Sequence, residues 1–416
     1  MLSLIASLWT LALWRDYPFS QQFILFNRKF FLLIFPWLFI AIISDSYSIE
    51  RICHMYDSLK NAGRTAIELC ILYSIFYFVS FPPYLPRLVV ILFAIVAFIF
   101  ITIWRVVYFR LFYDSYSQQI AIIGSLKEVE QIETSPVFCN LYKIVKLSSI
   151  EELSGCKVDK LILAGDQMDS ISLATILKVR ELGISIIPIS LFYERLYRKV
   201  LLADANQNYC SYTLPLEDNT QNACYSVLKR TIDIILSLIG LALFACIFPL
   251  LAAAIRLSSP GPVFFSQVRV GWYGKKFRLW KLRTMVTNAE DKGPMWTEHR
   301  DARVTGVGRI LRKLHLDEFP QLWNVLNGEM TIVGVRPLSV AENQKIALAM
   351  PLHNLRHLVK PSLTSWAVVN HKHVNNFEDA SVRLEYDLYY VKHQSFALDI
   401  LIILRTIWSI GTLNTL

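Results

Sequence analysis

The chain has 416 residues, of which 54% are hydrophobic and only 18% are charged, and its mean hydropathy is +0.40. This composition excludes an ordinary soluble protein of that length and favours a membrane protein. The formal net charge of +9 fits either nucleic acid or an anionic membrane surface with phosphorylated substrates. Because apolar runs separate the basic clusters, the pattern favours membrane lipid as the partner and argues against nucleic acid.

Residues 1–113 are predicted to form three to four transmembrane helices. Apolar runs occupy residues 2–14, 30–43, 66–81 and 88–104. Each run is shorter than or close to the ~20 residues that a full span requires, and the first could instead lie at the membrane interface. Basic residues after the second and fourth runs predict that these segments are cytoplasmic, so the chain beyond residue 113 begins inside the cell.

Residues 114–200 are predicted to form a small Rossmann-like α/β domain with a parallel sheet. Short β-like runs at 120–123, 160–164 and 185–189 alternate with polar stretches, including a predicted helix at 171–182. The turn at Gly124 lacks the further glycines of a dinucleotide fingerprint, so we predict no cofactor there. The same absence disfavours a nucleotide-sugar oxidoreductase or epimerase, which saturable NAD binding would support. Residues 201–224 are predicted to be a linker.

The apolar stretch at residues 232–257 is long enough to cross a bilayer. However, Lys229 and Arg230 precede it and Arg256 follows it, so both flanks are predicted to be cytoplasmic. A re-entrant membrane hairpin satisfies both flanks, and Pro249 is its expected bend because proline interrupts helical hydrogen bonding. The alternative is a simple kinked transmembrane helix.

An acidic pair, Asp317 and Glu318, precedes Pro320, which is tolerated only in a first helical turn. An apolar face is then predicted from Leu316, Phe319, Leu322, Trp323 and Leu326, with both carboxylates at the helix N-terminus. Two acids there could simply complement the helix dipole, which contributes about 0.3–1 kcal/mol. The cations gathered in the same region favour phosphate binding instead: Lys281, Arg283, Arg309, Arg312 and Arg336.

Four ordered motifs resemble the bacterial sugar transferase family of polyprenyl-phosphate phosphoglycosyl transferases. They are KRTID at 229–233, SPGPVFFSQVRVG at 259–271, KLRTM at 281–285 and GRILRKLHLDEFPQLWNVLNGEM at 308–330. The resemblance covers residues 225–416 and implies a mostly α-helical, monotopic catalytic domain. By hydropathy and order alone, the rest resembles the large-form members that prime exopolysaccharide or O-antigen synthesis.

The resemblance implies that Asp317 attacks the β-phosphate of a UDP-sugar, releases UMP and passes the phosphosugar to polyprenyl phosphate. It also implies that Glu318 binds Mg²⁺, which prefers carboxylate and phosphate oxygens. Arg312 and Arg336 would hold phosphate oxygens, with Lys281, Arg283 and Arg309 as further contacts, although a solvated surface charge stays open for each. The expected location is the bacterial inner membrane, with the active site on its cytoplasmic face.

The chain departs from the family pattern at Phe248, Val335, Ser362, Ser365 and Val368. Serine resists positive φ, so the loop at 361–370 is expected to be shaped differently, and donor specificity stays open. This loop favours a rival hypothesis, a non-catalytic membrane scaffold subunit, which the intact Asp317 and Glu318 oppose. A homodimer formed through the N-terminal units is a further open possibility, and residues 398–410 are predicted to lie at the membrane interface.

Cysteines and histidines give little sign of metal chemistry. The seven cysteines have no paired spacing, which argues against disulfides and a zinc site and fits a reducing compartment. His371 and His373 resemble a metal pair, but no third ligand lies at a recognisable spacing.

Overall fold

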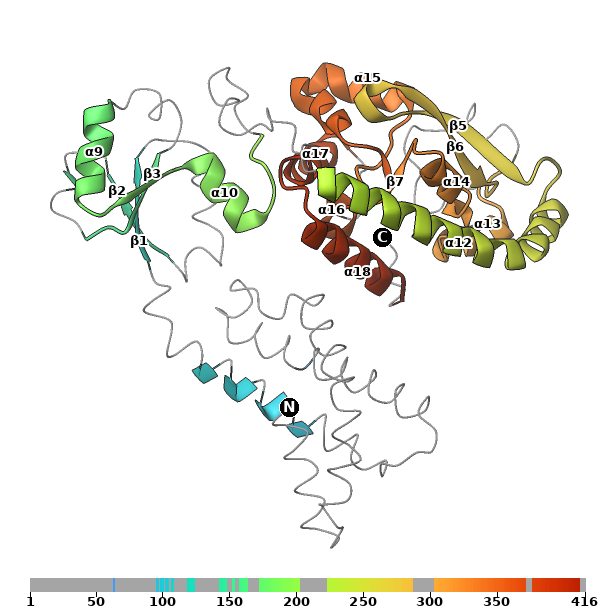
Figure 1. Cartoon of the computed structure of the whole chain (residues 1–416), viewed down its shortest axis with the longest axis horizontal. Helices are drawn as coiled ribbons and strands as arrows, with labels where there is room; N and C mark the ends of the chain where they lie inside the picture. Colours follow the sequence, from blue (N-terminus) through green and yellow to red (C-terminus); the bar gives the residue numbers. More distant parts are fainter. Residues whose placement is uncertain are drawn as a thin grey trace, which may run out of the picture. The chain divides into compact units, whose positions relative to one another are not determined.

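The structure is a computed structural model of the whole chain (Figure 1). It describes residues 118–123, 142–147, 152–153, 157–163, 172–202, 223–286, 303–371 and 376–411, with isolated helical positions at 63 and between 95 and 107. The predicted spans at 2–14, 30–43 and 66–81, and most of the linker at 201–224, lie outside these residues. Contacts divide the chain into two units, Met1–Ile189 and Ser190–Leu416, and each is described by itself.

The first unit contains a four-stranded parallel sheet, which confirms the predicted parallel sheet. The strand order is β2-β1-β3-β4, and the strands are β1 (Gln118–Ile123), β2 (Tyr142–Lys146), β3 (Lys160–Leu163) and β4 (Ser185–Pro188). Helix α9 (Leu173–Glu181) is capped by Ser172. Strand β2 was not predicted, because it lies at the sheet edge and exposes both of its lysines to some degree. The Gly124 turn lies outside the described residues, so the Rossmann-like arrangement without a cofactor stays a prediction.

The second unit is mostly helical, as the sequence indicates, and contains two small sheets (Figure 1). Strands β5 (Phe264–Val270) and β6 (Lys276–Leu282) form an antiparallel hairpin around the 3-10 turn η3 (Trp272–Gly274). Strands β7 (Thr331–Gly334) and β8 (Ser362–Ser365) pair in parallel. The helices and remaining 3-10 turns are α10 (Ile189–Tyr197), α12 (Ala223–Ser258), α13 (Gly306–Lys313), η5 (Leu316–Glu318), α14 (Gln321–Leu326), α15 (Val340–Ala349), η6 (Pro351–Leu358), α16 (Trp366–Asn370), α17 (Phe377–Lys392) and α18 (Phe396–Gly411).

Residues 190–202 pack against the rest of the second unit, although the sequence placed them at the end of the α/β domain. The buried Glu194 on α10 accepts hydrogen bonds from Lys392, at 2.8 Å, and from His393. The indole of Trp366 donates to the carbonyl of Arg198 at 2.9 Å. The boundary between the units therefore falls at Ile189 rather than after residue 200.

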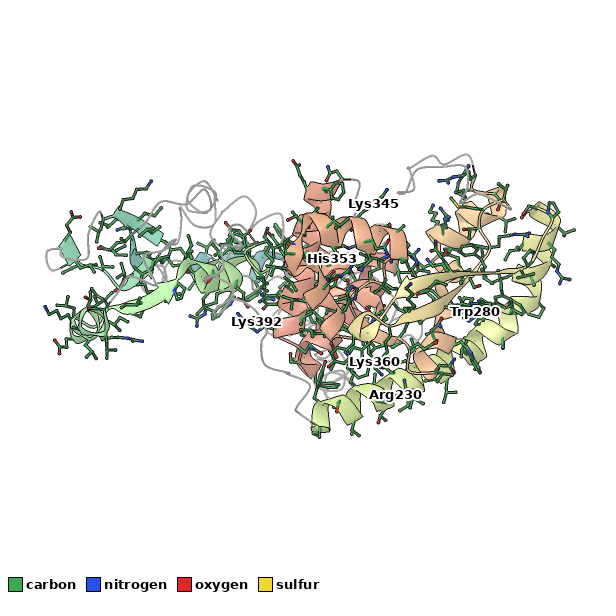
Figure 2. The ribbon with its side chains drawn as sticks, turned by 90° about the horizontal axis from the view of Figure 1, so that it is seen from above. Arg230, Trp280, Lys345, His353, Lys360 and Lys392 are labelled. Atoms are coloured by element: carbon green, nitrogen blue, oxygen red, sulfur yellow. The ribbon has the colours of Figure 1, made fainter. Side chains whose placement is uncertain are left out.

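Helix α12 is continuous for 36 residues and includes Pro249. At 1.5 Å per residue it is about 54 Å long, which exceeds the ~30 Å hydrocarbon core of a bilayer. Among the described residues it is the one helix apolar enough to cross a membrane, with a mean hydropathy of 2.8 over its most apolar window. The ribbon changes direction toward its C-terminal end (Figures 1 and 2). Whether the helix forms a re-entrant hairpin stays a prediction.

Charged residues near the start of α12 attach it to the rest of the unit (Figure 2). Lys229 pairs with Asp399 on α18 at 2.6 Å. Arg230 donates to two carbonyl oxygens at the end of α14, both at 2.6 Å. The carboxylate of Asp233, only 5% exposed, accepts from the Thr331 hydroxyl at 2.7 Å and from the Ile332 amide at 2.9 Å, both on β7. These contacts fix α14 and β7, which both follow the acidic pair in the sequence.

The middle and the end of α12 are attached to the same unit. Gly240 lies so close to Leu322 that a Cβ there would be 2.6 Å from its methyl carbon. Further along, the ring of Phe244 stacks on Phe319 at 5.7 Å. At the C-terminal end, the guanidinium of Arg283 donates to the Ser259 carbonyl at 2.6 Å and to the Pro260 carbonyl at 3.0 Å. The helix is therefore attached along its length, while its opposite face exposes apolar side chains such as Leu243 and Leu250.

Candidate active site

The acidic pair lies in the short 3-10 turn η5, between α13 and α14. The turn begins after His315, whose backbone is left-handed with a φ of 53°, a conformation that costs a non-glycine residue about 1–3 kcal/mol. Sequence reasoning placed both carboxylates in the first turn of α14, but α14 starts after Pro320. Trp323 is 55% exposed, so it does not pack with the predicted apolar face.

Helix α13 is held against Thr284, and this contact directs Arg312 toward the pair. Thr305 caps the helix by accepting from the Gly308 amide at 2.9 Å. At Gly308 a Cβ would lie 2.1 Å from the Thr284 carbonyl oxygen, so only glycine allows this close approach. The Arg312 Nε then donates to the Thr284 hydroxyl at 2.9 Å.

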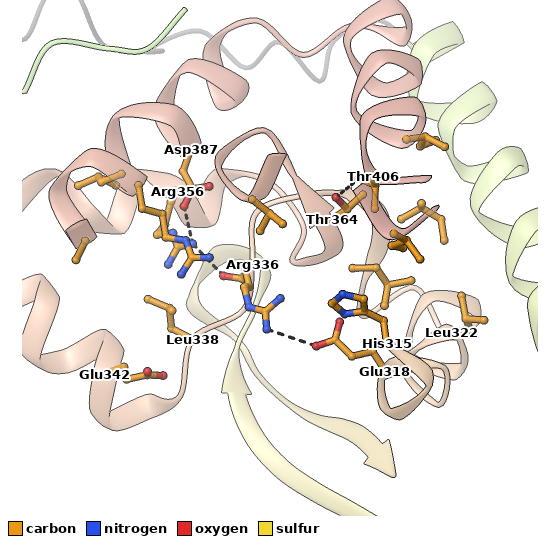
Figure 3. A pocket seen from close by; sticks show the side chains of 18 of the residues that line it. His315, Glu318, Leu322, Arg336, Leu338, Glu342, Arg356, Thr364, Asp387 and Thr406 are labelled. Carbon is orange, nitrogen blue, oxygen red and sulfur yellow. Dashed lines mark hydrogen bonds and ion pairs between the residues drawn. The ribbon is translucent and has the colours of Figure 1, made fainter. Parts of the chain in front are cut away.

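Glu318 is bound by two cations. The Lys281 ammonium lies 2.8 Å from Glu318 Oε1, and the Arg336 guanidinium lies 3.4 Å from the same oxygen (Figure 3). Burial raises the pKa of Glu318, but the positive charges of Lys281 and Arg336 lower it more, so this pKa lies far below its ordinary value. Glu318 is therefore ionised at any physiological pH.

Asp317 is in a different state. The residue as a whole is 7% exposed. Within the described part of the chain, its carboxylate accepts no hydrogen bond. Burial raises the pKa of Asp317, Lys281 opposes this rise, and the negative charge of Glu318 adds to it, so the pKa lies above its ordinary value. Two neighbouring carboxylates with pKa values moved in opposite directions are characteristic of catalytic pairs.

The structure separates the five predicted substrate-binding cations into two groups. Lys281, Arg312 and Arg336 lie around the acidic pair. Arg283 does not, since its guanidinium caps the C-terminal end of α12. Arg309 is exposed on the surface of α13 and has no partner among the described residues. The sequence could not assign the five cations to these two groups, because it gives the charge of each side chain but not the direction in which the side chain points.

A cavity of about 510 Å³ opens beside Glu318 (Figure 3). One part of its wall is apolar and includes Phe319, Leu322 and three isoleucines of α18, namely Ile403, Ile407 and Ile410. The other part is charged and includes Arg336, Arg356, Arg383, Glu342 and Asp387. Glu318 belongs to this wall, whereas Asp317 does not. The cavity suits a ligand that combines an anionic group with an apolar one.

Sequence reasoning missed two residues that shape the site. The fully buried Asn324 donates to the Arg278 carbonyl at 2.7 Å and accepts from the Trp280 amide at 3.2 Å, which holds β6 and hence Lys281 in place. His315 lines the cavity beside Glu318 (Figure 3). Only its place in the motif, two residues before Asp317, could have drawn attention to it.

The departures from the family pattern are accommodated locally. Neither Ser362 nor Ser365 has a positive φ, and Ser365 is extended at −145°, so serine causes no backbone strain here. Ser365 instead caps α16 by accepting from the Val368 amide at 3.1 Å. Val368 lines the cavity, and Val335 is buried in the core without displacing Arg336 from Glu318. Phe248 stacks on Phe264 at 5.2 Å.

Metal ligands are sparse at the site. Among the described residues there is no group of three or more His, Cys, Asp or Glu side chains that could hold a metal ion. Mg²⁺ commonly uses only one or two carboxylates together with substrate phosphates and water. Both cations contact Glu318 through Oε1, which leaves its Oε2 for such an ion. Of the two histidines considered as a metal pair, His371 has its Nε2 atom 3.7 Å from Asp379 Oδ1, and His373 lies outside the described residues.

The acidic pair, its cations and the long apolar helix suit a membrane-associated protein with an anionic substrate. A family model described as bacterial sugar transferase matches residues 224–412. The chain is 36% identical over 219 residues, 53% of its length, to UDP-N-acetylgalactosamine-undecaprenyl-phosphate N-acetylgalactosaminephosphotransferase of Aeromonas hydrophila, of which this covers 50%. It is 40% identical over 197 residues, 47% of its length, to UDP-glucose:undecaprenyl-phosphate glucose-1-phosphate transferase of Escherichia coli, of which this covers 42%.

A further relative, the UDP-glucose:undecaprenyl-phosphate glucose-1-phosphate transferase of Caulobacter vibrioides, is 38% identical over 186 residues, which are 44% of this chain and 70% of the relative. The chain thus matches about half the length of the first two relatives and more than two thirds of the third. The chain belongs to the bacterial sugar transferase family, which confirms the resemblance seen in its motifs.

The opposite states of the two carboxylates predict opposite effects on stability at pH 7.5. Asp317→Asn removes a buried charge that has no hydrogen-bond partner, so its melting temperature should equal or exceed that of the wild type. Glu318→Gln leaves Lys281 without its counter-charge and should cost about 1–2 kcal/mol. The matched control is Glu378→Gln, an exposed carboxylate in the first turn of α17, which should lose at most its helix-dipole contribution of about 0.3–1 kcal/mol.

The pH dependence follows from the raised pKa of Asp317. Because the folded state holds this proton more tightly than the unfolded state, the wild type loses stability relative to Asp317→Asn as the pH rises from about 4 through the raised pKa. Thermal melts at several pH values measure this difference. If the wild type instead gains stability relative to Asp317→Asn as the pH rises, the raised pKa of Asp317 is contradicted.

Proposed function

We propose that this protein transfers a sugar 1-phosphate from a UDP-sugar to polyprenyl phosphate, as the first membrane step of polysaccharide assembly. The observation that carries the proposal is the buried Asp317 carboxylate, which accepts no hydrogen bond within the described chain and lies among Lys281, Arg312 and Glu318. A carboxylate that lies among cations and accepts no hydrogen bond from the described residues can act as a nucleophile toward phosphorus. The names of the relatives, which include a UDP-sugar donor and undecaprenyl phosphate, support the choice of substrates.

The reaction has two steps. A carboxylate oxygen of Asp317 attacks the β-phosphorus of the UDP-sugar, and the bond from this phosphorus to the bridging oxygen breaks. UMP leaves with the bonding electron pair, and the sugar phosphate stays on Asp317 as an acyl phosphate. A phosphate oxygen of polyprenyl phosphate then attacks the same phosphorus and releases the Asp317 carboxylate. The product is a polyprenyl diphosphate sugar.

The surrounding residues stabilise charge during both steps. Lys281 and Arg312 lie beside Asp317, where they would bind the phosphate oxygens that gain negative charge. Arg336, 40% exposed, would bind phosphate through its planar guanidinium. Glu318 would hold Mg²⁺ through the oxygen that its cations leave unused. When bound, Mg²⁺ supplies positive charge that orients and neutralises the diphosphate.

We predict that the purified full-length chain releases UMP when it is given a UDP-sugar, polyprenyl phosphate and Mg²⁺. Asp317→Asn should reduce this release by about 10³-fold or more, because the amide cannot act as the nucleophile. A panel of UDP-sugars in the same assay identifies the donor.

The exposed variant Glu378→Gln is the control and should release UMP at the wild-type rate. Substantial turnover by Asp317→Asn would contradict the covalent mechanism. A wild-type chain that releases no UMP with any donor would instead favour a non-catalytic scaffold subunit.

We further propose that α12 enters and leaves the inner membrane on the cytoplasmic side, so that the active site faces the cytoplasm. Asp233 near the start of α12 and Ser259 just after its end both bond to the same folded unit. A helix that crossed the bilayer would put these contacts on opposite sides of the membrane. The exposed apolar face of α12, and the apolar helix α18 beside its start, would then lie in the membrane together.

Cysteine labelling tests this topology. Ser226→Cys near the start of α12 and Ser258→Cys at its end, in a background without native cysteines, should both be protected from an impermeant thiol reagent in intact cells. Both should react after the cells are permeabilised, which is the control for accessibility. Labelling of the residue-258 cysteine alone in intact cells would mean that α12 spans the bilayer.

A further inference from the structure

The charged wall of the cavity brings together three arginines from distant parts of the sequence. Arg336 follows β7, Arg356 belongs to η6 and Arg383 belongs to α17. Arg356 is neutralised, because its guanidinium lies 2.7 Å from the Asp387 carboxylate in a pair that is 1–2% exposed. It also donates to the Arg336 carbonyl at 2.9 Å (Figure 3). Arg356 is therefore a structural residue that fixes the backbone of Arg336.

Arg383 has no such partner. It lies one helical turn before Asp387 on α17, but the Oδ2 atom of Asp387 is paired with Arg356, and its buried Oδ1 atom accepts no hydrogen bond from Arg383. Within the described residues Arg383 makes no hydrogen bond or ion pair, and its Nε is buried without an acceptor. Burial lowers the pKa of Arg383 to about 10, and the positive charges of Arg336 and Arg356 contribute to this decrease. A charge in this position is costly unless an anion joins it.

The carboxylates on the same wall, Asp387 and Glu342, partly offset this decrease in the pKa of Arg383 but do not hydrogen-bond to it. Glu342 accepts from the Ser339 backbone and hydroxyl and lies 3.4 Å from Arg269. Arg336 has one long ion pair with Glu318, at 3.4 Å, and its side chain is 40% exposed. Arg336 and Arg383 therefore both present guanidinium groups to the cavity with hydrogen-bonding capacity to spare.

We propose that Arg383 and Arg336 form a phosphate-binding subsite in this cavity. The inference rests on the proposed function, because it takes the bound phosphate to belong to one of the two substrates. Two planar guanidinium groups suit the tetrahedral oxygens of phosphate, which each can contact in bidentate fashion. The phosphate of the lipid acceptor and the diphosphate of the nucleotide-sugar share this chemistry, and the experiment distinguishes them.

Steady-state kinetics of Arg383→Gln and Arg383→Lys in the full-length chain, in lipid nanodiscs, test the subsite. Loss of a charge-assisted contact should reduce kcat/KM for one substrate by about 10- to 100-fold in Arg383→Gln. Arg383→Lys keeps the positive charge but loses the planar, bidentate guanidinium group, so kcat/KM should fall less in this variant than in Arg383→Gln. Arg195→Gln, an exposed arginine on α10, is the matched control and should behave as the wild type.

Exchange of labelled UMP into the UDP-sugar without acceptor separates the two sources of phosphate. If the subsite binds the donor, Arg383→Gln slows this exchange. If it binds the lipid phosphate, exchange is unchanged and only the KM for polyprenyl phosphate rises. A folded Arg383→Gln with wild-type KM values for both substrates would overturn the proposal.

A second measurement keeps the subsite testable if the proposed function fails. Inorganic pyrophosphate should raise the melting temperature of the wild type more than that of Arg383→Gln, whether or not the chain releases UMP. Equal shifts in the two proteins would overturn the subsite independently of turnover. Wild-type protein that shows the shift but releases no UMP would refute the function and retain the subsite.

Discussion

The active site depends on the attachment of one apolar helix, α12, through its charged first turns. Asp233 bonds to β7, which leads to Arg336, and Arg230 bonds to the end of α14, which follows Asp317 and Glu318. Burying a charge near a membrane is costly unless it is hydrogen-bonded, and each of these charges is. The same residues that connect the helix to the protein therefore hold the two segments that follow the acidic pair and lead to Arg336.

The two carboxylates of the acidic pair have unequal numbers of cationic contacts. Glu318 takes the contacts of Lys281 and Arg336 and is stabilised as an anion, whereas Asp317 remains buried without a hydrogen bond. Burying Asp317 without a hydrogen bond lowers the stability of the folded state. The attachment of α12 and the core around Phe244 and Phe319 stabilise the fold and can offset this loss. Such a cost fits the proposed role of Asp317 as the nucleophile, because a carboxylate whose oxygens are all hydrogen-bonded would be less reactive.

The sequence predicted the elements whose signals are local. The parallel sheet and the long apolar helix follow from hydropathy and spacing. What it could not predict depends on contacts between distant segments. Asn324 bonds to a strand 46 residues away, Arg283 turns to the end of α12, and Arg383 makes no hydrogen bond within the described residues although Asp387 lies one turn further along α17. Trp323 was assigned to an apolar face from its spacing alone, whereas its side chain is exposed.

Hydrogen exchange in the variant Asp233→Ala tests the role of the α12 attachment most directly. Without its acceptor, the Ile332 amide should exchange faster along with the rest of β7, and UMP release should fall by about 10-fold or more. Thr231→Ala is the control, since this exposed hydroxyl bonds only to Val227 in its own helix. Wild-type exchange in β7 together with wild-type UMP release in Asp233→Ala would contradict the account.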